Sequence, residues 1–227
     1  MQRLSLALVL AVVLVGNAQA ANEVHPEDID KVNGAITASA GQAYGDLETV
    51  NGGIRIEAGA RTENAETING SIKVAERAQT GDLSTVNGGI RLGREVQVDG
   101  SLETVNGDVF VDQGSRVSGG ISTVNGAIGL VGAELGKDIE TVNSDITVGV
   151  GSHVRGGIRI EKPTRSWLPI SMGKRRPPRV TIGPDAVVDG PLVFEREVRL
   201  YVHDSARIGP VTGATAQRYQ GEPPQEE

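Results

Sequence analysis

The sequence contains no cysteine, and aromatic residues make up only 3% of its 227 positions. Disulfide bonds and cysteine-ligated metal centres are therefore excluded. The scarcity of aromatic rings, together with 31 glycines, argues against a compact core filled by large side chains. The formal net charge of −7 disfavours general binding to nucleic acid. His25, His153 and His203 are the three histidines, and none lies in a recognisable catalytic or zinc-binding motif.

Long apolar runs are also lacking, with one exception near the N-terminus. Arg3 precedes a mostly apolar stretch, Leu4 to Val15, which is followed by Ala18-Gln19-Ala20. This is the pattern of a cleavable secretory signal, and the predicted cut falls after Ala20. The stretch is too short for a permanent membrane span, which needs about 20 apolar residues. The sequence therefore predicts a periplasmic or secreted protein without a transmembrane segment in its mature chain.

A short repeated segment, most often Thr-Val-Asn-Gly, dominates the first two thirds of the chain. Its asparagine recurs every 18 or 19 residues, at Asn33, Asn51, Asn69, Asn87, Asn106, Asn125 and Asn143. Apolar residues fall into aligned columns around it, such as Ile36, Ile54, Ile72, Ile90, Val109, Ile128 and Ile146. Polar residues separate neighbouring apolar columns, and this alternation predicts strands with one buried face.

Two all-β architectures fit this repeat. Asn-Gly is a strong signal for a hairpin turn, so an antiparallel meander is one of them. In the other, each repeat is one coil of a parallel β-solenoid, and identical residues stack on one another about 4.8 Å apart. The matching columns favour the second. We predict a single-stranded parallel β-helix of about 18 residues per coil and nine or ten coils, forming a rod of about 45 Å.

The asparagines have a structural explanation in this architecture. Asn tolerates a left-handed backbone at a corner, and stacked Asn amides can bond to one another as a ladder. The threonines Thr49, Thr67, Thr85, Thr104, Thr123 and Thr141 form a second column beside it. Because the corner interrupts simple alternation, the sequence leaves open whether Thr or the neighbouring Val faces the core.

The pattern divides the chain into six segments. Residues 1–20 are the signal peptide, 21–28 a linker, and 29–160 the regular solenoid repeats. Residues 161–179 form a basic, proline-rich loop insertion, in which four prolines disfavour a regular coil. Residues 180–212 form the final coils, since Ile182, Val188, Phe194 and Leu200 recur every six residues, as three sides of one coil require. The polar tail 213–227 is predicted to be disordered.

The loop insertion is the candidate partner-binding site. It concentrates Lys162, Arg165, Lys174, Arg175, Arg176 and Arg179 around the single tryptophan, Trp167, in an otherwise acidic protein. One interpretation is a solvated insertion whose apolar residues fold back on the solenoid. The other is a docking site for an envelope protein or an anionic surface polymer, since Trp and basic residues suit such partners.

The repeats carry no pattern that predicts catalysis, a cofactor or a metal site. Glu48, Glu66, Glu103 and Glu140 form a row interspersed with Ser84 and Ser122, which is typical of a solvated strand face. The Gly-Gly pairs are followed by Ile and lack the aspartate of a calcium β-roll. We therefore expect a protein that is not an enzyme.

The "TVNGGIRI" and "TVNGDVFV" segments resemble the bacterial adhesin β-strand repeat family, a domain of unknown function with repeated V-N-G-x-I segments. The uniform coil length and the six-residue spacing near the C-terminus also resemble bactofilins, which are polymer-forming β-helix proteins. These resemblances imply a structural scaffold or adhesin-like interaction protein in the bacterial cell envelope. The alternatives are a filament protein that self-associates end to end, and a carbohydrate-binding or carbohydrate-active β-helix.

Overall fold

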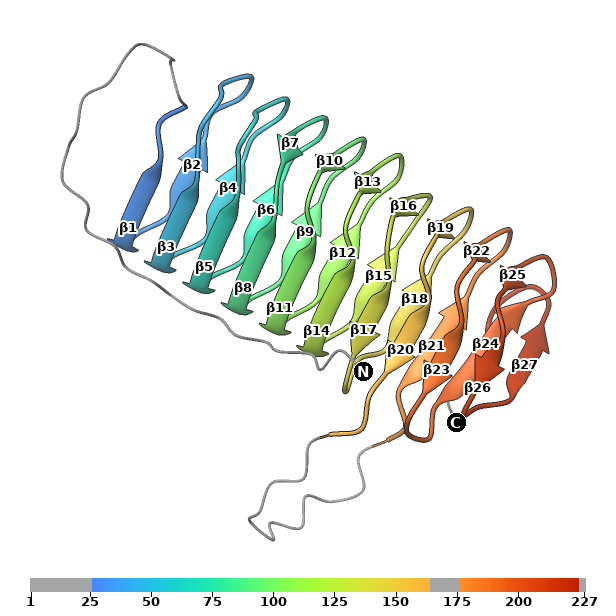
Figure 1. Cartoon of the computed structure of the whole chain (residues 1–227). Helices are drawn as coiled ribbons and strands as arrows, with labels where there is room; N and C mark the ends of the chain where they lie inside the picture. The colour runs from blue at the N-terminus through green and yellow to red at the C-terminus, as the bar shows by residue number, and fades with distance from the viewer. Residues whose placement is uncertain (1–25, 164–175, 225–227) are drawn as a thin grey trace, which may run out of the picture.

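The computed structural model describes residues 26–163 and 176–224. These residues form three parallel sheets, and each coil contributes one strand to sheets A and B and, in seven coils, a third strand to sheet C. Figure 1 shows the coils following one another along a single axis, from β1 at one end to β27 at the other. The strand pairs are parallel and join equivalent residues of successive repeats, such as Asn33 with Asn51. The parallel β-solenoid is thus confirmed, and the hairpin meander is excluded.

Sheet A has ten strands, and its order along the axis follows the sequence. They are β1 (Ile29–Asn33), β3 (Leu47–Asn51), β5 (Ala65–Asn69), β8 (Leu83–Asn87), β11 (Leu102–Asn106), β14 (Ile121–Asn125), β17 (Ile139–Thr141), β20 (Ile158–Ile160), β23 (Leu192–Phe194) and β26 (Val211–Thr212). Nine steps of about 4.8 Å between them give a stack of about 43 Å.

Sheet B also has ten strands and begins beyond the Asn-Gly corner. They are β2 (Ile36–Ala38), β4 (Ile54–Ile56), β6 (Ile72–Val74), β9 (Ile90–Leu92), β12 (Val109–Val111), β15 (Ile128–Leu130), β18 (Ile146–Val148), β21 (Arg179–Ile182), β24 (Arg199–His203) and β27 (Ala216–Tyr219). Sheet C has seven two-residue strands, namely β7 (Gln79–Thr80), β10 (Gln97–Val98), β13 (Arg116–Val117), β16 (Glu134–Leu135), β19 (His153–Val154), β22 (Val187–Val188) and β25 (Arg207–Ile208).

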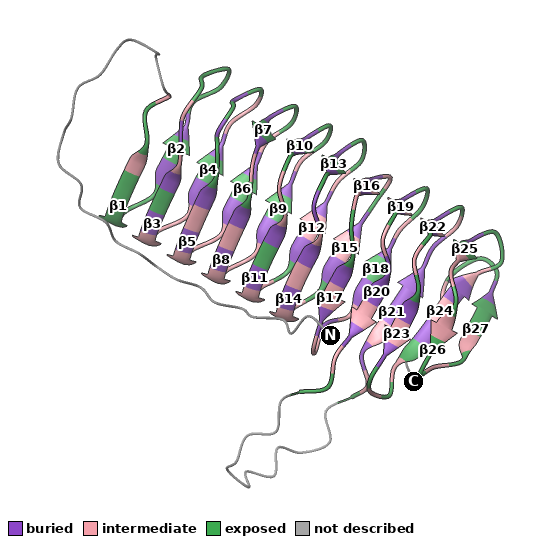
Figure 2. Ribbon diagram, in the orientation of Figure 1, coloured by how far each residue is buried: buried purple, intermediate pink, exposed green. Residues whose placement is uncertain are grey.

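The core is a column of aliphatic side chains that fills the interior of the coils. Ile54, Leu47 and Val98 are each at most 1% exposed, and their equivalents in neighbouring coils are buried in the same way. Figure 2 shows the consequence, with buried residues alternating with exposed or half-buried ones along the strands. Short β-branched residues stack here in register, so the core needs no large aromatic rings.

The threonine of the repeat faces the interior, which settles the question that the sequence left open. Thr67, Thr85 and Thr104 are at most 3% exposed. Their hydroxyls donate to the carbonyls of Gly52, Gly70 and Gly88 in the preceding coil, at 2.8, 2.9 and 2.9 Å. The following Val or Ile is half-buried on the outer face of sheet A. The hydroxyl thus satisfies a corner carbonyl that the strand pairing leaves unbonded.

Glycine is needed at the Asn-Gly corner because successive coils approach closely there. A Cβ atom on Gly70, Gly88 or Gly107 would lie 1.9 Å from the glycine oxygen of the preceding coil. The asparagines themselves lie at strand ends and do not adopt the left-handed backbone that we expected of them. Most residues with positive φ lie instead at the corner between sheets B and C, such as Gly59, Arg77 and Glu95, while Gly34 and Gly126 are the glycines with positive φ at the Asn-Gly corner.

The predicted disordered tail is wrong for residues 216–219. They form β27, which pairs in parallel with β24. Tyr219 is 8% exposed, and its hydroxyl donates to the Ile182 carbonyl at 3.2 Å. The tail orders because β24 offers an unpaired edge and because the Tyr219 ring covers the end of the core, which a composition argument does not consider. The final coils therefore extend beyond the predicted limit at residue 212.

Candidate anion-binding cleft at the end of the asparagine ladder

The seven repeat asparagines form one continuous ladder of side-chain hydrogen bonds. Each Nδ2 donates to the Oδ1 of the asparagine in the preceding coil, at 3.0 to 3.1 Å, from Asn51 through Asn143. The predicted ladder is therefore confirmed, and its bonds all run in one direction. As a result, the amide oxygen of Asn143 is the acceptor at the C-terminal end of the ladder.

Arg196 closes that end. Its Nη1 donates to Asn143 Oδ1 at 2.6 Å and to the Val142 carbonyl at 3.0 Å. Arg196 lies between β23 and β24, two coils beyond Asn143, so it spans the corner of the intervening coil. A guanidinium has five N–H donors on three nitrogens. Among the described residues, partners of the Arg196 guanidinium are found for Nη1 alone. Nε and Nη2 are left to bind a further acceptor.

A gap in the stack explains why Arg196 must reach so far. The chain leaves the solenoid after β20 and returns to it at β21, at the corner where earlier coils carry Asn-Gly, and the described residues 161–163 and 176–178 belong to no strand. Just before this point, Ser144 replaces the usual glycine, and its hydroxyl accepts a bond from Thr141 Oγ1 at 2.7 Å. Glycine N–H groups of earlier coils donate to the next asparagine carbonyl, from Gly34 N to Asn51 O through Gly107 N to Asn125 O.

The gap forms a cleft of about 470 Å³ beside the last ladder residues. Its lining includes Gly126, Asn143, Asp145, Arg176, Pro178 and Arg196. Arg176 Nη2 donates to Asp145 Oδ2 at 2.5 Å, and the Arg179 backbone N donates to Asp145 Oδ1 at 2.9 Å. Both carboxylate oxygens of Asp145 thus accept hydrogen bonds, whereas Arg196 donates only to two uncharged oxygens. The positive charge of Arg196 is therefore not neutralised by these contacts and can attract an anion in the cleft.

Three of the seven predicted loop residues lie within the described structure. Lys162 is exposed. Arg176 and Arg179 hold the base of the loop through Asp145, and Arg179 also stacks on the Tyr201 ring at 4.9 Å and donates to the Pro224 carbonyl at 2.6 Å. Arg165, Trp167, Lys174 and Arg175 lie outside the described residues. Arg179 belongs to β21 and not to the loop, whose described base is therefore one residue shorter than predicted.

A second ladder, which the sequence reading missed, lies at the corner between sheets C and A. The carboxylate of Asp46 accepts bonds from the Asn64 backbone N and Nδ2 at 3.1 and 2.9 Å, and Asn64 Oδ1 accepts from Asp82 N at 2.9 Å. The signal was an Asp or Asn one residue before five strands of sheet A, at Asp28, Asp46, Asn64, Asp82 and Asp138. Scattered aspartates in the sequence are therefore structural acceptors in the fold.

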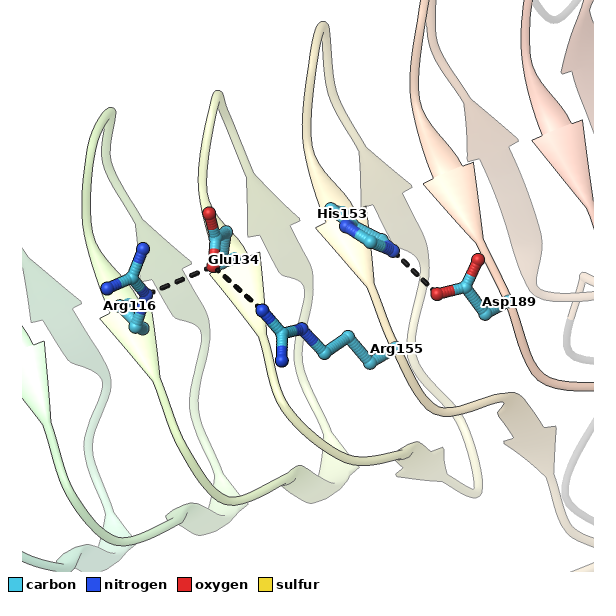
Figure 3. Close-up of polar contacts among 5 residues, drawn as sticks. All are labelled: Arg116, Glu134, His153, Arg155 and Asp189. Atoms are coloured by element: carbon cyan, nitrogen blue, oxygen red, sulfur yellow. Dashed lines mark hydrogen bonds and ion pairs between the residues drawn. The ribbon is translucent and has the colours of Figure 1, made fainter.

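The outer face of sheet C carries two clusters of polar contacts, one around Glu134 and one between His153 and Asp189 (Figure 3). Glu134 lies between Arg116 and Arg155, with N–O distances of 3.0 and 3.6 Å. The hydrogen bond from Arg116 is the main reason why the pKa of Glu134 is lowered. His153 Nε2 lies 2.6 Å from Asp189 Oδ2. The contacts of Glu134 are exposed ion pairs, which generally contribute little to stability.

The described residues contain no group of three or more histidines or carboxylates arranged to hold a metal ion. Nor do they contain a helix long and apolar enough to cross a membrane. Comparisons with protein-family models, curated proteins and solved structures find no match for this chain. The resemblance to adhesin repeats and bactofilins therefore stays a prediction from the repeat pattern.

Proposed function

We propose that the protein is an exported, non-enzymatic β-solenoid that acts as a structural scaffold or interaction rod in the bacterial cell envelope. This proposal rests on one observation, namely that the repeated side chains hold successive coils together. Asn, Thr and Asx side chains bond one coil to the next, and the aliphatic columns fill the core. The repeats therefore form a rod with long outer faces. Such faces can bind or position other components of the cell envelope.

The export part of the proposal is tested by fractionating the native producing cell and sequencing the N-terminus of the recovered protein. We expect the protein in the periplasm or the medium, beginning at Ala21. A cytoplasmic protein that retains Met1 to Ala20 would contradict export.

The terminal strands favour a second candidate function, in which the rods assemble end to end into filaments. Val32 of β1 is 67% exposed, and β1 pairs with β3 while its other edge has no partner strand in the described part of the chain. An uncovered strand edge is a template for pairing with another chain. Light scattering of the purified mature protein over a range of concentrations separates the two candidates. A constant monomer mass supports the single rod, and a mass that grows with concentration supports the filament.

A further inference from the structure

The Asn-Gly corner presents a long outer surface with few charges, which we call the corner strip. It consists of the ladder asparagines Asn51 to Asn125 and the half-buried apolar residue before each of them, namely Val50, Ile68, Val86, Val105 and Val124. On the other side of the asparagines lie Gly53, Ser71, Gly89, Asp108 and Ala127, and the carboxylate of Asp108 accepts a bond from Ala127 N at 2.7 Å. The strip runs parallel to the solenoid axis and ends at the cleft beside Asn143.

Apart from Asp108, the charged residues lie in rows on the faces that flank the strip. Asp30, Glu48 and Glu66 form a row on the outer face of sheet A. Arg55, Lys73 and Arg91 form a row on the outer face of sheet B. A strongly charged polymer would be attracted to one row and repelled by the other, whereas the strip between them suits a chain whose contacts are mainly hydrogen bonds.

The ladder leaves hydrogen-bonding capacity on its outer side. A primary amide has two N–H donors and two acceptor lone pairs. Each of the asparagines Asn51 to Asn125 uses one donor and one lone pair in the ladder, and their side chains are exposed or half-buried. One donor and one acceptor per coil therefore remain available, repeated about every 4.8 Å. Hydroxyl groups, which both donate and accept, are the matching partners.

The apolar half of the strip fits the same class of ligand. Val86 and Val105 offer half-buried methyl groups beside the amides. Sugar rings have C–H faces as well as hydroxyl edges, so an extended oligosaccharide can contact both columns at once. Because a sugar unit in an extended glycan is about as long as one strand spacing, successive rings can repeat the same contacts from coil to coil.

The cleft adds a preference for one charged group. Nη1 of Arg196 bonds Asn143 Oδ1 and Val142 O, and its Nε and Nη2 face no other described partner. Guanidinium and carboxylate pair in a two-pronged geometry. The cleft volume of about 470 Å³ has room for a sugar ring that bears a carboxylate.

We propose that the corner strip and the cleft together bind an extended oligosaccharide that carries a single carboxylate at one end, whose hydroxyls bond the asparagine amides and whose carboxylate pairs with Arg196. This deepens the proposed function by naming the ligand class of the rod, and it rests on that proposal for the compartment in which the glycan is met. Export and glycan binding are measured separately, so either can fail while the other holds.

The test is calorimetric titration of the full mature protein with a cello-oligosaccharide that carries one terminal glucuronic acid, the methyl ester of that acid, the unmodified cello-oligosaccharide and a polyglutamate peptide. We expect the oligosaccharide with the free carboxylate to bind most tightly, and both its methyl ester and the unmodified cello-oligosaccharide to bind about tenfold more weakly, as the loss of one charge-assisted hydrogen bond implies. Equal binding of polyglutamate would overturn the proposal, because carboxylates without sugar would then suffice. Failure of every glycan to bind would also overturn it.

Three variants locate the site. Arg196→Gln should weaken binding of the oligosaccharide with the free carboxylate about tenfold and leave binding of its methyl ester unchanged. Val86→Glu places a charge on the strip without altering the ladder or the cleft, and it should weaken both ligands, which keeps the test valid if Arg196→Gln does not fold. Arg55→Gln removes an exposed cation from sheet B and is the matched control. An equal loss of affinity in Arg55→Gln and Arg196→Gln would contradict the proposed site.

Discussion

At the scale of single residues, the threonine column shows how a polar side chain can be part of an aliphatic core. Thr85 is 2% exposed, yet its hydroxyl has a partner in the Gly70 carbonyl at 2.9 Å. The Thr methyl group packs among the aliphatic residues while the oxygen bonds the corner. A buried hydroxyl without such a partner would destabilise the fold.

Thr85→Val tests this contact. Valine has nearly the same shape but cannot donate, so the Gly70 carbonyl loses its bond and unfolding should become easier by about 1 kcal/mol. The measurement is the urea unfolding midpoint followed by circular dichroism. Thr147→Val is the control, because Thr147 is exposed on sheet B. A midpoint shift no larger than that of the control would show that the hydroxyl bond contributes nothing.

The residue scale also shows what sequence reasoning could reach. The ladder from Asn33 to Asn143 was predictable, because identical residues at a fixed interval must stack in a parallel solenoid. Arg196 was not, because it lies 53 residues from Asn143 in the sequence and meets it through the gap left by the insertion. No repeat pattern predicts a contact of that kind.

At the scale of elements, the C-terminal strand determines how the solenoid ends. β27 pairs with β24, Tyr219 covers the last core layer, and Arg218 donates to the carbonyls of His203 and Ala206 at 3.1 and 3.3 Å. Burial raises the pKa of the Tyr219 hydroxyl. This end is therefore closed in part by side chains as well as by a strand.

Truncation after Thr212 tests the role of β27. Removal of residues 213–227 exposes the edge of β24, so we expect a lower thermal midpoint and self-association by light scattering. Truncation after Pro224 is the matched control, because it leaves every described contact of β27 in place. Equal midpoints and equal masses for the two truncations would show that β27 does not protect this end.

At the scale of the whole molecule, acidic and basic side chains form rows on different faces of the solenoid, the acidic row on sheet A and the basic row on sheet B. Because equivalent residues stack, Asp30, Glu48 and Glu66 follow one another along sheet A. Partial desolvation, and then the neighbouring carboxylates, raise the pKa of Glu48 above its ordinary 4.5. Desolvation also raises the pKa of Glu140, where the contributing carboxylates are Glu161 and Asp138. A stacked row of carboxylates such as Asp30, Glu48 and Glu66 thus incurs like-charge repulsion.

This arrangement predicts a pH dependence of stability. A carboxyl whose folded pKa is raised stabilises the fold below 4.5, and that contribution is lost as the pH rises through the folded pKa. Replacement of Glu48 and Glu140 by Gln should therefore raise the thermal midpoint at pH 7 and flatten its dependence on pH above 4.5. Glu134, with its lowered pKa, acts in the opposite direction, and its contribution is lost as the pH falls through that pKa.

Thermal scans from acidic to neutral pH provide the measurement. Glu103→Gln is the control, because Glu103 lies in the same row between Ser84 and Ser122 and has no carboxylate directly above or below it. If the double variant and the control change the profile equally, the crowding of carboxylates on sheet A has no effect on stability.

The sequence by itself determined the coil length, the parallel stacking and the asparagine ladder, because a repeat of 18 or 19 residues places like residues in register. It also determined where the solenoid is interrupted, since prolines and a run of cations cannot continue a coil. Tertiary structure alone decided that Thr points inward, that the tail forms β27, and that Arg196 meets Asn143 at a cleft. Each of these depends on which atoms lie opposite one another across a corner or an end, and a one-dimensional pattern contains no such distances.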